Sequence, residues 1–539
     1  MQVRRLAAWV ALPLSLSLGL AACGKGGDSG SGNSNGVVSI GIAEPQHLLP
    51  GNTNETSGSQ VLAALFAPLV DFDEANKPVE VAAESISTTD NKTWTIKLKD
   101  GWKFHNGEAV TADSYLDSWN YAAYGPNKQD NGYFFERVEG YADLNPKDAN
   151  ATPAAQTLSG LKKVDDKTFT VTLSEPFSEF KSVLGYTAFY PLPKAAFKDP
   201  AAKPLVLKED FEQAPIGNGP FKMKGTWKHD SKVEVEKYAD YKGPAPKIGG
   251  VTFGIYQNSQ AEYADLLANN LDVVKAIPTE SLSTVQGDLG DRFLQSPAST
   301  LQLLAFPTFD ARFSKPEVRK AISMAIDREE IANAVFQGSQ KAAYSFVSPV
   351  VAGYRDKSCG TACDFKPTEA KAMYQAAGGP KDINITYNND GGHKQWVDAT
   401  CNQLKTNLGV NCVGTPEAKF ADLLQKVEDK KDVGMFRMGW VMDYPSMENY
   451  LGPLYSTTGS SNYYGYSNPE FDSLVKQGAA APNQDEAIKK YQQAEDLLAR
   501  DMPVLPLRFG QNNFGHSNNV KNVSIDLFNR VDLVKIEMA

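Results

Sequence analysis

An arginine and an aspartate stand inside an otherwise apolar and aromatic segment, residues 435–445, which reads Met-Phe-Arg-Met-Gly-Trp-Val-Met-Asp-Tyr-Pro. Buried charges are costly unless each has an ionic partner. The functional interpretation is that Arg437 and Asp443 line a cleft and await an oppositely charged ligand. In the alternative interpretation, Arg437 pairs with another side chain and Trp440 belongs to the core. Asp443 then only begins a turn before Pro445.

The sequence contains no recognisable catalytic or metal-binding constellation. Its five histidines are far apart and form no His-Glu-x-x-His pair, and there is no Gly-x-x-x-x-Gly-Lys-Ser/Thr phosphate loop. The glycine-rich stretch 217–220 ends in a proline, which lacks the N–H group that a phosphate would use, so it is interpreted as a turn. We therefore expect no enzyme activity, no cofactor and no metal site, although the abundant carboxylates leave glycoside hydrolysis by paired acids open.

The N-terminal segment has the features of an export signal. Two arginines precede an apolar run over residues 6–22 that is short and contains a proline, unlike a membrane-spanning helix. The run ends Leu-Ala-Ala-Cys, which resembles the bacterial lipobox, so we expect residues 1–22 to be a signal peptide and Cys23 to carry the lipid anchor. Residues 23–36 would form the anchor and a flexible tether rich in glycine and serine. The alternative is an ordinary signal cleavage site with an incidental cysteine.

Four further cysteines follow, Cys359, Cys363, Cys401 and Cys412. An even number in an exported chain favours disulfides, and four cysteines allow three connectivities. Cys359 and Cys363 are close enough in sequence to close a small loop. Cys401 lies in a helical pattern and Cys412 in the strand that follows it, so local pairing is favoured for both pairs. A structural zinc site is the rival, but the spacing contains no Cys-x-x-Cys pair.

The chain is acidic and has an ordinary globular composition. Its 539 residues include 54 basic and 64 acidic side chains, a net charge of −10, which argues against a protein that binds the phosphate backbone of nucleic acid. A chain of this length is expected to form about two to four structural units. Alternating strand patterns, as at 94–98 and 169–173, and amphipathic helical patterns, as at 316–326, predict an α/β fold.

Several motifs, in order along the chain, resemble one known family, the extracytoplasmic solute-binding lipoproteins of oligopeptide/dipeptide ABC transporters, in the large peptide/nickel-binding class (family 5). The resemblance extends over essentially all of residues 37–539. The motifs that carry it are Trp-Thr-Ile-Lys-Leu-Lys-Asp-Gly-Trp-Lys-Phe-His-Asn-Gly at 94–107 with Thr-Ala-Asp at 111–113, Ile-Gly-Asn-Gly-Pro-Phe at 216–221, Val-Arg-Lys-Ala-Ile-Ser-Met-Ala-Ile-Asp-Arg at 318–328 and Asn-Tyr-Tyr-Gly-Tyr at 462–466.

The resemblance implies an α/β fold of two lobes that close on a ligand like a Venus flytrap, the type II periplasmic-binding-protein arrangement. An extra domain is inserted in the first lobe. Lobe I would comprise residues 37–66, 216–298 and 508–539, the extra domain residues 67–215, and lobe II residues 299–507. Three chain crossings between the lobes would form a hinge.

The same resemblance implies a peptide site in the cleft between the lobes. In oligopeptide binders the segment like 439–443 pairs with the backbone of an extended peptide, and the aspartate at the position of Asp443 receives the peptide's α-ammonium group. Arg437 matches an arginine that meets a short peptide's C-terminal carboxylate. His393 matches a histidine that serves longer peptides, and its alternative is a solvated loop histidine. The first-lobe loop 54–56 would bond the peptide from the other side. The expected ligand-binding residues are Asp443, Trp440, Gly439, Val441, Arg437, His393, Asn54 and Thr56.

The function implied by the resemblance is the capture of extracellular oligopeptides and their delivery to an ABC permease, with ATP hydrolysed by separate subunits. The protein would be a monomer without a nucleic-acid partner, held at the cell membrane by its lipidated N-terminus, on a Gram-positive surface or on the periplasmic side. One alternative is the same scaffold binding a metal chelate, haem or saccharide; another is a secreted hydrolase. Asp443 together with Arg437 favours a zwitterionic peptide.

Overall fold

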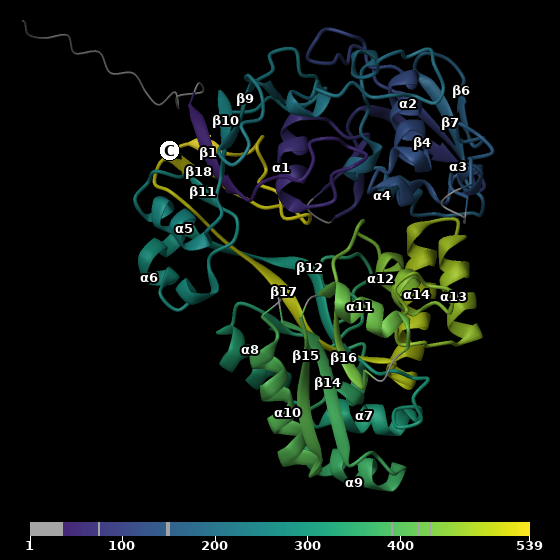
Figure 1. The fold of residues 1–539 in the computed structure, drawn as a ribbon, viewed down its shortest axis with the longest axis vertical. Coiled ribbons are helices and arrows are strands. Elements are labelled where there is room, and N and C mark those ends of the chain that lie inside the picture. The colour runs from purple at the N-terminus through teal and green to yellow at the C-terminus, as the bar shows by residue number, and fades with distance from the viewer. Residues whose placement is uncertain (1–35, 74–75, 147–150, 390–391, 419, 431–432) are drawn as a thin grey trace, which may run out of the picture. The chain divides into compact units, whose positions relative to one another are not determined.

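The computed structural model describes residues 36–73, 76–146, 151–389, 392–418, 420–430 and 433–539. Two thirteen-residue antiparallel strands, β12 (Phe293–Ala305) and β17 (Val504–His516), form the link between two α/β halves (Figure 1). At one end of this strand pair, β16 pairs with the last five residues of β12. At the other end, β11 pairs with the last two residues of β17. In the described part of the chain, all these strands belong to one eleven-stranded sheet.

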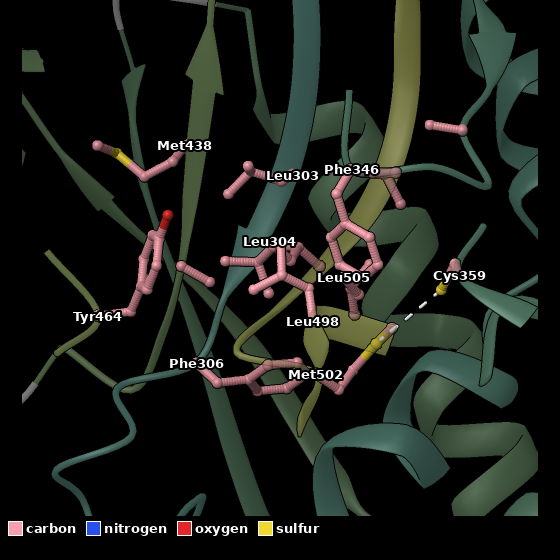
Figure 2. Close-up of a cluster of buried hydrophobic side chains, with 14 of the residues drawn as sticks. Leu303, Leu304, Phe306, Phe346, Cys359, Met438, Tyr464, Leu498, Met502 and Leu505 are labelled. Atoms are coloured by element: carbon pink, nitrogen blue, oxygen red, sulfur yellow. Dashed lines mark hydrogen bonds between the residues drawn. The ribbon is translucent and has the colours of Figure 1, made fainter. Parts of the chain in front are cut away.

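Lobe II is the half at the β16 end of the strand pair. β14 is parallel to both β15 and β16, whereas β16 is antiparallel to β12. Buried apolar side chains of the sheet and helices form one core, and Figure 2 shows part of it, with Leu303 and Leu304 of β12, Met438 of β16 and Leu505 of β17. The elements of this half are α7 (Pro316–Met324), α8 (Arg328–Phe336), β13 (Lys341–Ala342), α9 (Pro367–Ala377), β14 (Asp382–Asn388), α10 (Lys394–Leu408), β15 (Asn411–Glu417), α11 (Phe420–Glu428), β16 (Met435–Trp440), α12 (Glu448–Tyr455), α13 (Pro469–Ala479) and α14 (Gln484–Asp501).

The first turn of helix α10 lies beside strands β16 and β17. It ends at Gly409, whose φ of +76° lies in the left-handed region that glycine adopts at helix C-termini. The helix contains Cys401, in agreement with the helical pattern that the sequence shows around this residue. Its buried side chains recur at helical spacing: Trp396, Val397, Thr400, Cys401, Leu404 and Leu408.

The cysteines form the two local pairs that the sequence favours. Cys401 of α10 is joined to Cys412 of β15, with their Cα atoms 5.0 Å apart, so this disulfide ties the helix to the edge of the sheet. Cys359 is joined to Cys363, with a Cα separation of 5.8 Å. Both pairs are buried within the lobe II core.

Lobe I is the half at the β11 end, where β1 is parallel to both β10 and β11. Its main core gathers apolar side chains of β1, α1, β9 and β10, and it also includes side chains from residues 190–211. The elements are β1 (Val37–Ile42), α1 (Thr56–Leu65), β8 (Phe221–Met223), β9 (Lys232–Lys237), β10 (Gly250–Ile255), α5 (Ser259–Leu267), β11 (Val273–Val274), α6 (Val285–Leu289), β18 (Val520–Lys521) and β19 (Glu537–Met538).

The extra domain has its own four-stranded sheet in the order β4-β5-β7-β6. Trp94, Ile96 and Leu98 alternate along β5 and are all buried, which confirms the strand predicted there. The core of this domain takes its side chains mainly from residues 67–189. The domain limits given above stay a prediction. The elements are β2 (Val70–Phe72), β3 (Pro78–Glu80), β4 (Ala83–Thr88), β5 (Thr93–Leu98), α2 (Ala112–Ala123), α3 (Tyr141–Leu144), β6 (Leu161–Lys163), β7 (Thr168–Thr172) and α4 (Phe180–Val183).

The export signal and Cys23, predicted from the sequence, lie outside the described residues. Within residues 36–539, apart from the undescribed gaps, no helix has the length and apolar character needed to cross a membrane.

Candidate ligand-binding site

Strand β16 is paired along its length with one neighbouring strand but only at its start with the other. On one side it pairs with β12, from Ala305 opposite Phe436 to Leu301 opposite Trp440. On the other side, the described pairs with β14 end at Phe436. The backbone of residues 438–440 therefore has one edge without a partner strand in the described part of the chain. An extended peptide can add to such an edge as a further strand.

Gly439 is required by the packing of β16 against β12. A Cβ atom at this position would lie 2.8 Å from the side-chain amide of Gln302, the residue directly opposite on β12. The glycine thus allows Gln302 to lie across the strand, and it leaves the β16 backbone accessible. Val441, just beyond the strand, is 60% exposed.

Asp443 lies in the loop after β16, where the buried side chain of Asn449 holds it. The backbone N–H of Asp443 donates to Asn449 Oδ1 at 2.7 Å, and Asn449 Nδ2 donates to Asp443 Oδ2 at 3.3 Å. Trp440 Nε1 donates to the same Asn449 Oδ1 at 3.3 Å. Among the described residues no basic side chain forms an ion pair with Asp443, so the carboxylate is oriented but its charge is not neutralised.

The surroundings of Asp443 favour its protonated form. Burial raises the pKa of Asp443 from 3.8 to about 6; the hydrogen bond from Asn449 lowers the pKa, and the nearby charge of Glu448 raises it. A carboxylate in this setting gains most from a cation that binds beside it, because the cation removes the cost of burying the negative charge.

Two tyrosines of the extra domain lie near this carboxylate. The pKa values of the Tyr133 and Tyr186 phenols are raised, first by desolvation and second by the charge of Asp443. The ring of Phe134 joins the two, with centroid distances of 4.5 Å to Tyr133 and 4.2 Å to Tyr186. Asp443 therefore faces an aromatic surface that the sequence alone did not predict.

Arg437 and His393 are brought together by β16 and the start of α10. Arg437 Nε lies 2.8 Å from His393 Nε2, and Trp396 Nε1 lies 3.1 Å from His393 Nδ1. A neutral imidazole offers one acceptor nitrogen, so it satisfies one of these two donors at a time. His393 is only 6% exposed, and the alternative of a solvated loop histidine is therefore wrong. The Arg437 guanidinium also stacks on Phe420 at 4.9 Å.

Asn54 and Thr56 belong to lobe I, at the start of α1. Both are exposed, and Asn54 Nδ2 donates to Asp130 Oδ2 at 3.4 Å. The described hydrogen bonds and ion pairs do not join either residue to the lobe II residues of the site. An indirect link exists, because Asn131 donates from its side chain to the carbonyls of Pro50 and Thr53 and stands two residues before Tyr133.

Nothing in the described part of the chain resembles a metal centre, since no three His, Cys, Asp or Glu side chains gather there. The arrangement instead offers a backbone edge, the carboxylate of Asp443 after one end of it and the guanidinium group of Arg437 near the other. These groups can bind and orient a polar chain.

Comparison with known proteins gives consistent matches over most of the chain. Residues 77–462 match the family described as bacterial extracellular solute-binding proteins, family 5 Middle. The oligopeptide-binding protein OppA of Bacillus subtilis is 28% identical over 95% of this chain and 96% of its own length. The dipeptide-binding protein DppE of the same organism is 28% identical over 84% of this chain and 82% of its own. Among solved structures, the periplasmic murein tripeptide-binding protein MppA superposes with a TM-score of 0.79, covering 94% of this chain and 98% of that one at 22% identity.

Proposed function

Because the chain belongs to the bacterial extracellular solute-binding proteins, family 5, we propose that it is the receptor of an ABC importer and that it captures extracellular oligopeptides. It delivers them to a membrane permease and catalyses no reaction itself; ATP is hydrolysed by separate subunits. The names of the oligopeptide-binding and dipeptide-binding relatives support a peptide ligand.

The observation that carries the proposal is the un-neutralised carboxylate of Asp443 beside the unpaired edge of β16. The peptide's α-ammonium group pairs with Asp443, and its backbone pairs with residues 439–441. Backbone pairing gives affinity that does not depend on side-chain sequence, while the ammonium–carboxylate pair fixes the direction and register of the peptide. Trp440, held by Asn449, packs against the bound chain.

The remaining predicted residues take complementary roles in this proposal. Arg437 meets the C-terminal carboxylate of a short peptide, with His393 beside it. Asn54 and Thr56 contact the peptide from lobe I when the lobes close. The protein acts as a monomer, and Cys23 carries the lipid that holds it at the outer face of the cell membrane.

Calorimetry with tetra-alanine tests the proposal. We expect strong binding, and Asp443→Ala to weaken it by about 3–5 kcal/mol, because the peptide's ammonium group would then be buried without a partner. N-acetylation of the peptide should weaken its binding to the wild type by a similar amount and should weaken its binding to the variant little. Equal affinity of the wild type for free and acetylated peptides would contradict the role of Asp443. Mass spectrometry of the recovered peptide checks the absence of turnover, and cleavage would favour a hydrolase.

A further inference from the structure

Buried arginines in this protein usually have their donors satisfied. Arg319 donates to the carbonyls of Asp501, Met502, Phe313 and Ser314. Arg328 donates to the carbonyls of Pro506, Ser323 and Cys363 and to the Ser323 hydroxyl. Arg530 forms an ion pair with Asp526 at 2.7 Å. Each of these guanidinium groups is a crosslink within the fold, with acceptors that compensate for its burial.

Arg508 of β17 is as buried as these residues, at 4% exposure, but its donors are not all satisfied. Its Nε donates to the side-chain oxygen of Gln340. Its Nη1 is buried and has no hydrogen-bond partner in the described part of the chain, and no carboxylate described there forms an ion pair with it. A buried N–H group without an acceptor destabilises the protein, and the cost is larger when the group is charged. The group therefore has the capacity for one more acceptor.

The guanidinium of Arg508 is fixed in position by aromatic rings. It stacks on Phe336 of α8, with 4.4 Å between the guanidinium carbon and the ring centroid, and on Trp396 of α10 at 4.9 Å. Stacking of this kind holds the planar group without using its N–H donors. A pre-positioned guanidinium with a spare donor nitrogen is suited to binding an oxygen atom of an anion.

A second guanidinium group and a helix N-terminus lie near Arg508. Burial and, to a smaller extent, the charge of Arg437 lower the pKa of Arg508 to about 9, which still leaves it protonated at neutral pH. Helix α10 begins beside it and has no acidic residue in its first turn, so the positive end of the helix dipole is not compensated there. Arg437 contacts His393 and Arg508 stacks on Trp396, so both guanidinium groups lie near the N-terminus of α10.

Arg508 lies close to the proposed peptide-binding strand. In the sheet, Gly439 of β16 is opposite Gln302 of β12, and Gln302 is opposite Arg508 of β17, so the three residues form one row across adjacent strands. Strand spacing of about 4.8 Å places the backbone of Arg508 about 10 Å from that of Gly439. Its neighbours Phe336, Gln340 and Arg437 are all partly exposed. Only one layer of side chains therefore separates the guanidinium from the surface of lobe II.

We propose that Arg508 is a second carboxylate-binding residue of the site, which, together with Arg437, receives a carboxylate group of the bound ligand when Gln340 moves aside. The inference rests on the proposed peptide-binding function. The carboxylate is either the C-terminus of the peptide or an acidic side chain within it. Both present the same planar anion to the guanidinium.

Calorimetry on the full-length protein with paired peptides tests the assignment. Tetra-alanine and its C-terminal amide differ only in the terminal carboxylate. Ala-Glu-Ala-Ala and Ala-Gln-Ala-Ala, both amidated, differ only in a side-chain carboxylate. Arg508→Met removes the charge but keeps an unbranched side chain between Phe336 and Trp396. Arg500→Gln removes a charge from the exposed surface of the same lobe and serves as the matched control.

We expect Arg508→Met to lose roughly tenfold or more in affinity for one carboxylate-bearing peptide and to lose little for its neutral partner. Selective loss with tetra-alanine identifies the terminal carboxylate, and selective loss with the glutamate peptide identifies a side chain. Arg508→Lys keeps the charge but not the planar donor group of the guanidinium, and it should recover part of the affinity. This variant is measured in the same way if the methionine variant does not fold.

Equal losses for both members of each pair, or no loss, would overturn the assignment and leave Arg508 as a packing residue. Failure of the wild-type protein to bind any of the peptides would be a different result, because it overturns the proposed peptide function and this inference with it. The Arg500→Gln control should bind all four peptides as the wild type does.

Discussion

Asn449 holds Asp443 from both sides: its Oδ1 accepts the backbone N–H of Asp443 at 2.7 Å, and its Nδ2 donates to the carboxylate at 3.3 Å. The asparagine stands in the first turn of α12 and is 2% exposed, so its own position is fixed by the core of lobe II. The direction of the carboxylate is therefore set before any ligand arrives. Such preorganisation lowers the cost of binding.

Asn449→Ala should weaken binding of tetra-alanine by about 1–2 kcal/mol, because the carboxylate and the Trp440 indole each lose an orienting hydrogen bond. Calorimetry measures the loss. Asn483→Ala is the matched control: it removes the N-cap bond to Glu486 N of α14, far along the chain from β16. The control should cost about 1 kcal/mol of stability and leave peptide affinity unchanged. An Asn449→Ala variant that binds like the wild type would show that the asparagine does not orient the site.

The sequence predicted the charged members of the site because charge in an apolar segment is conspicuous. Arg437 and Asp443 were identified by the cost of burying them, and the structure places them with Trp440 on β16 and the loop after it. Asn449 and Arg508 could not be identified in this way. Asn449 contacts Asp443 because the chain between them, six residues long, folds back on itself. Arg508 is held by a hydrogen bond to Gln340, which is 168 residues away in the chain.

Local patterns predicted individual elements better than their arrangement. Hydrophobic periodicity predicts strand β5 and helix α7, since each buries one face. The thirteen-residue strands β12 and β17 were not predicted as a continuous pair, because their pairing joins residues about two hundred positions apart. The aromatic surface of Tyr133 and Tyr186 beside Asp443 was also not predicted, for the same reason.

The Cys401–Cys412 disulfide ties α10 to β15 across a separation of eleven residues. Replacing both cysteines with serine should lower the free energy of unfolding by about 2–3 kcal/mol, mainly because the unfolded chain regains conformational freedom. Chemical denaturation measures the change. The same replacement at Cys359 and Cys363, which are four residues apart, should cost less because the loop is shorter. A larger loss at the short loop would contradict the chain-entropy explanation.

Cys23→Ala should release the protein from membranes, because the proposed lipid attaches to the Cys23 sulfur. Cell fractionation and immunoblotting measure the shift, with a membrane-spanning protein as the loading control. Cys359→Ala is a matched control, since this cysteine lies in the core of lobe II and should not affect membrane association. Persistence of the Cys23→Ala variant in the membrane fraction would show that the anchor is elsewhere.

Peptide affinity should depend on pH through Asp443, whose pKa burial raises from 3.8 to about 6 in the ligand-free protein. The ammonium group binds the ionised carboxylate, so affinity should be greatest above pH 6 and fall by up to about tenfold per pH unit below it. It should fall again above about pH 8, where the peptide's own amino group loses its proton. Calorimetry at pH 5, 6, 7 and 8 measures the profile.

The raised pKa of Asp443 affects the stability of the ligand-free protein in the opposite direction: affinity rises with pH, whereas stability falls. A carboxyl whose pKa is higher in the folded than in the unfolded protein favours folding at low pH, and that contribution is lost as the pH rises from about 4 to 6. Asp443→Asn should therefore stabilise the ligand-free protein at pH 7, by at most about 3 kcal/mol, and change it little at pH 4. It should also abolish the fall in affinity below pH 6. An Asp443→Asn variant that is less stable than the wild type at pH 7, or that keeps the fall in affinity below pH 6, would show that Asp443 is not the group that couples binding to pH.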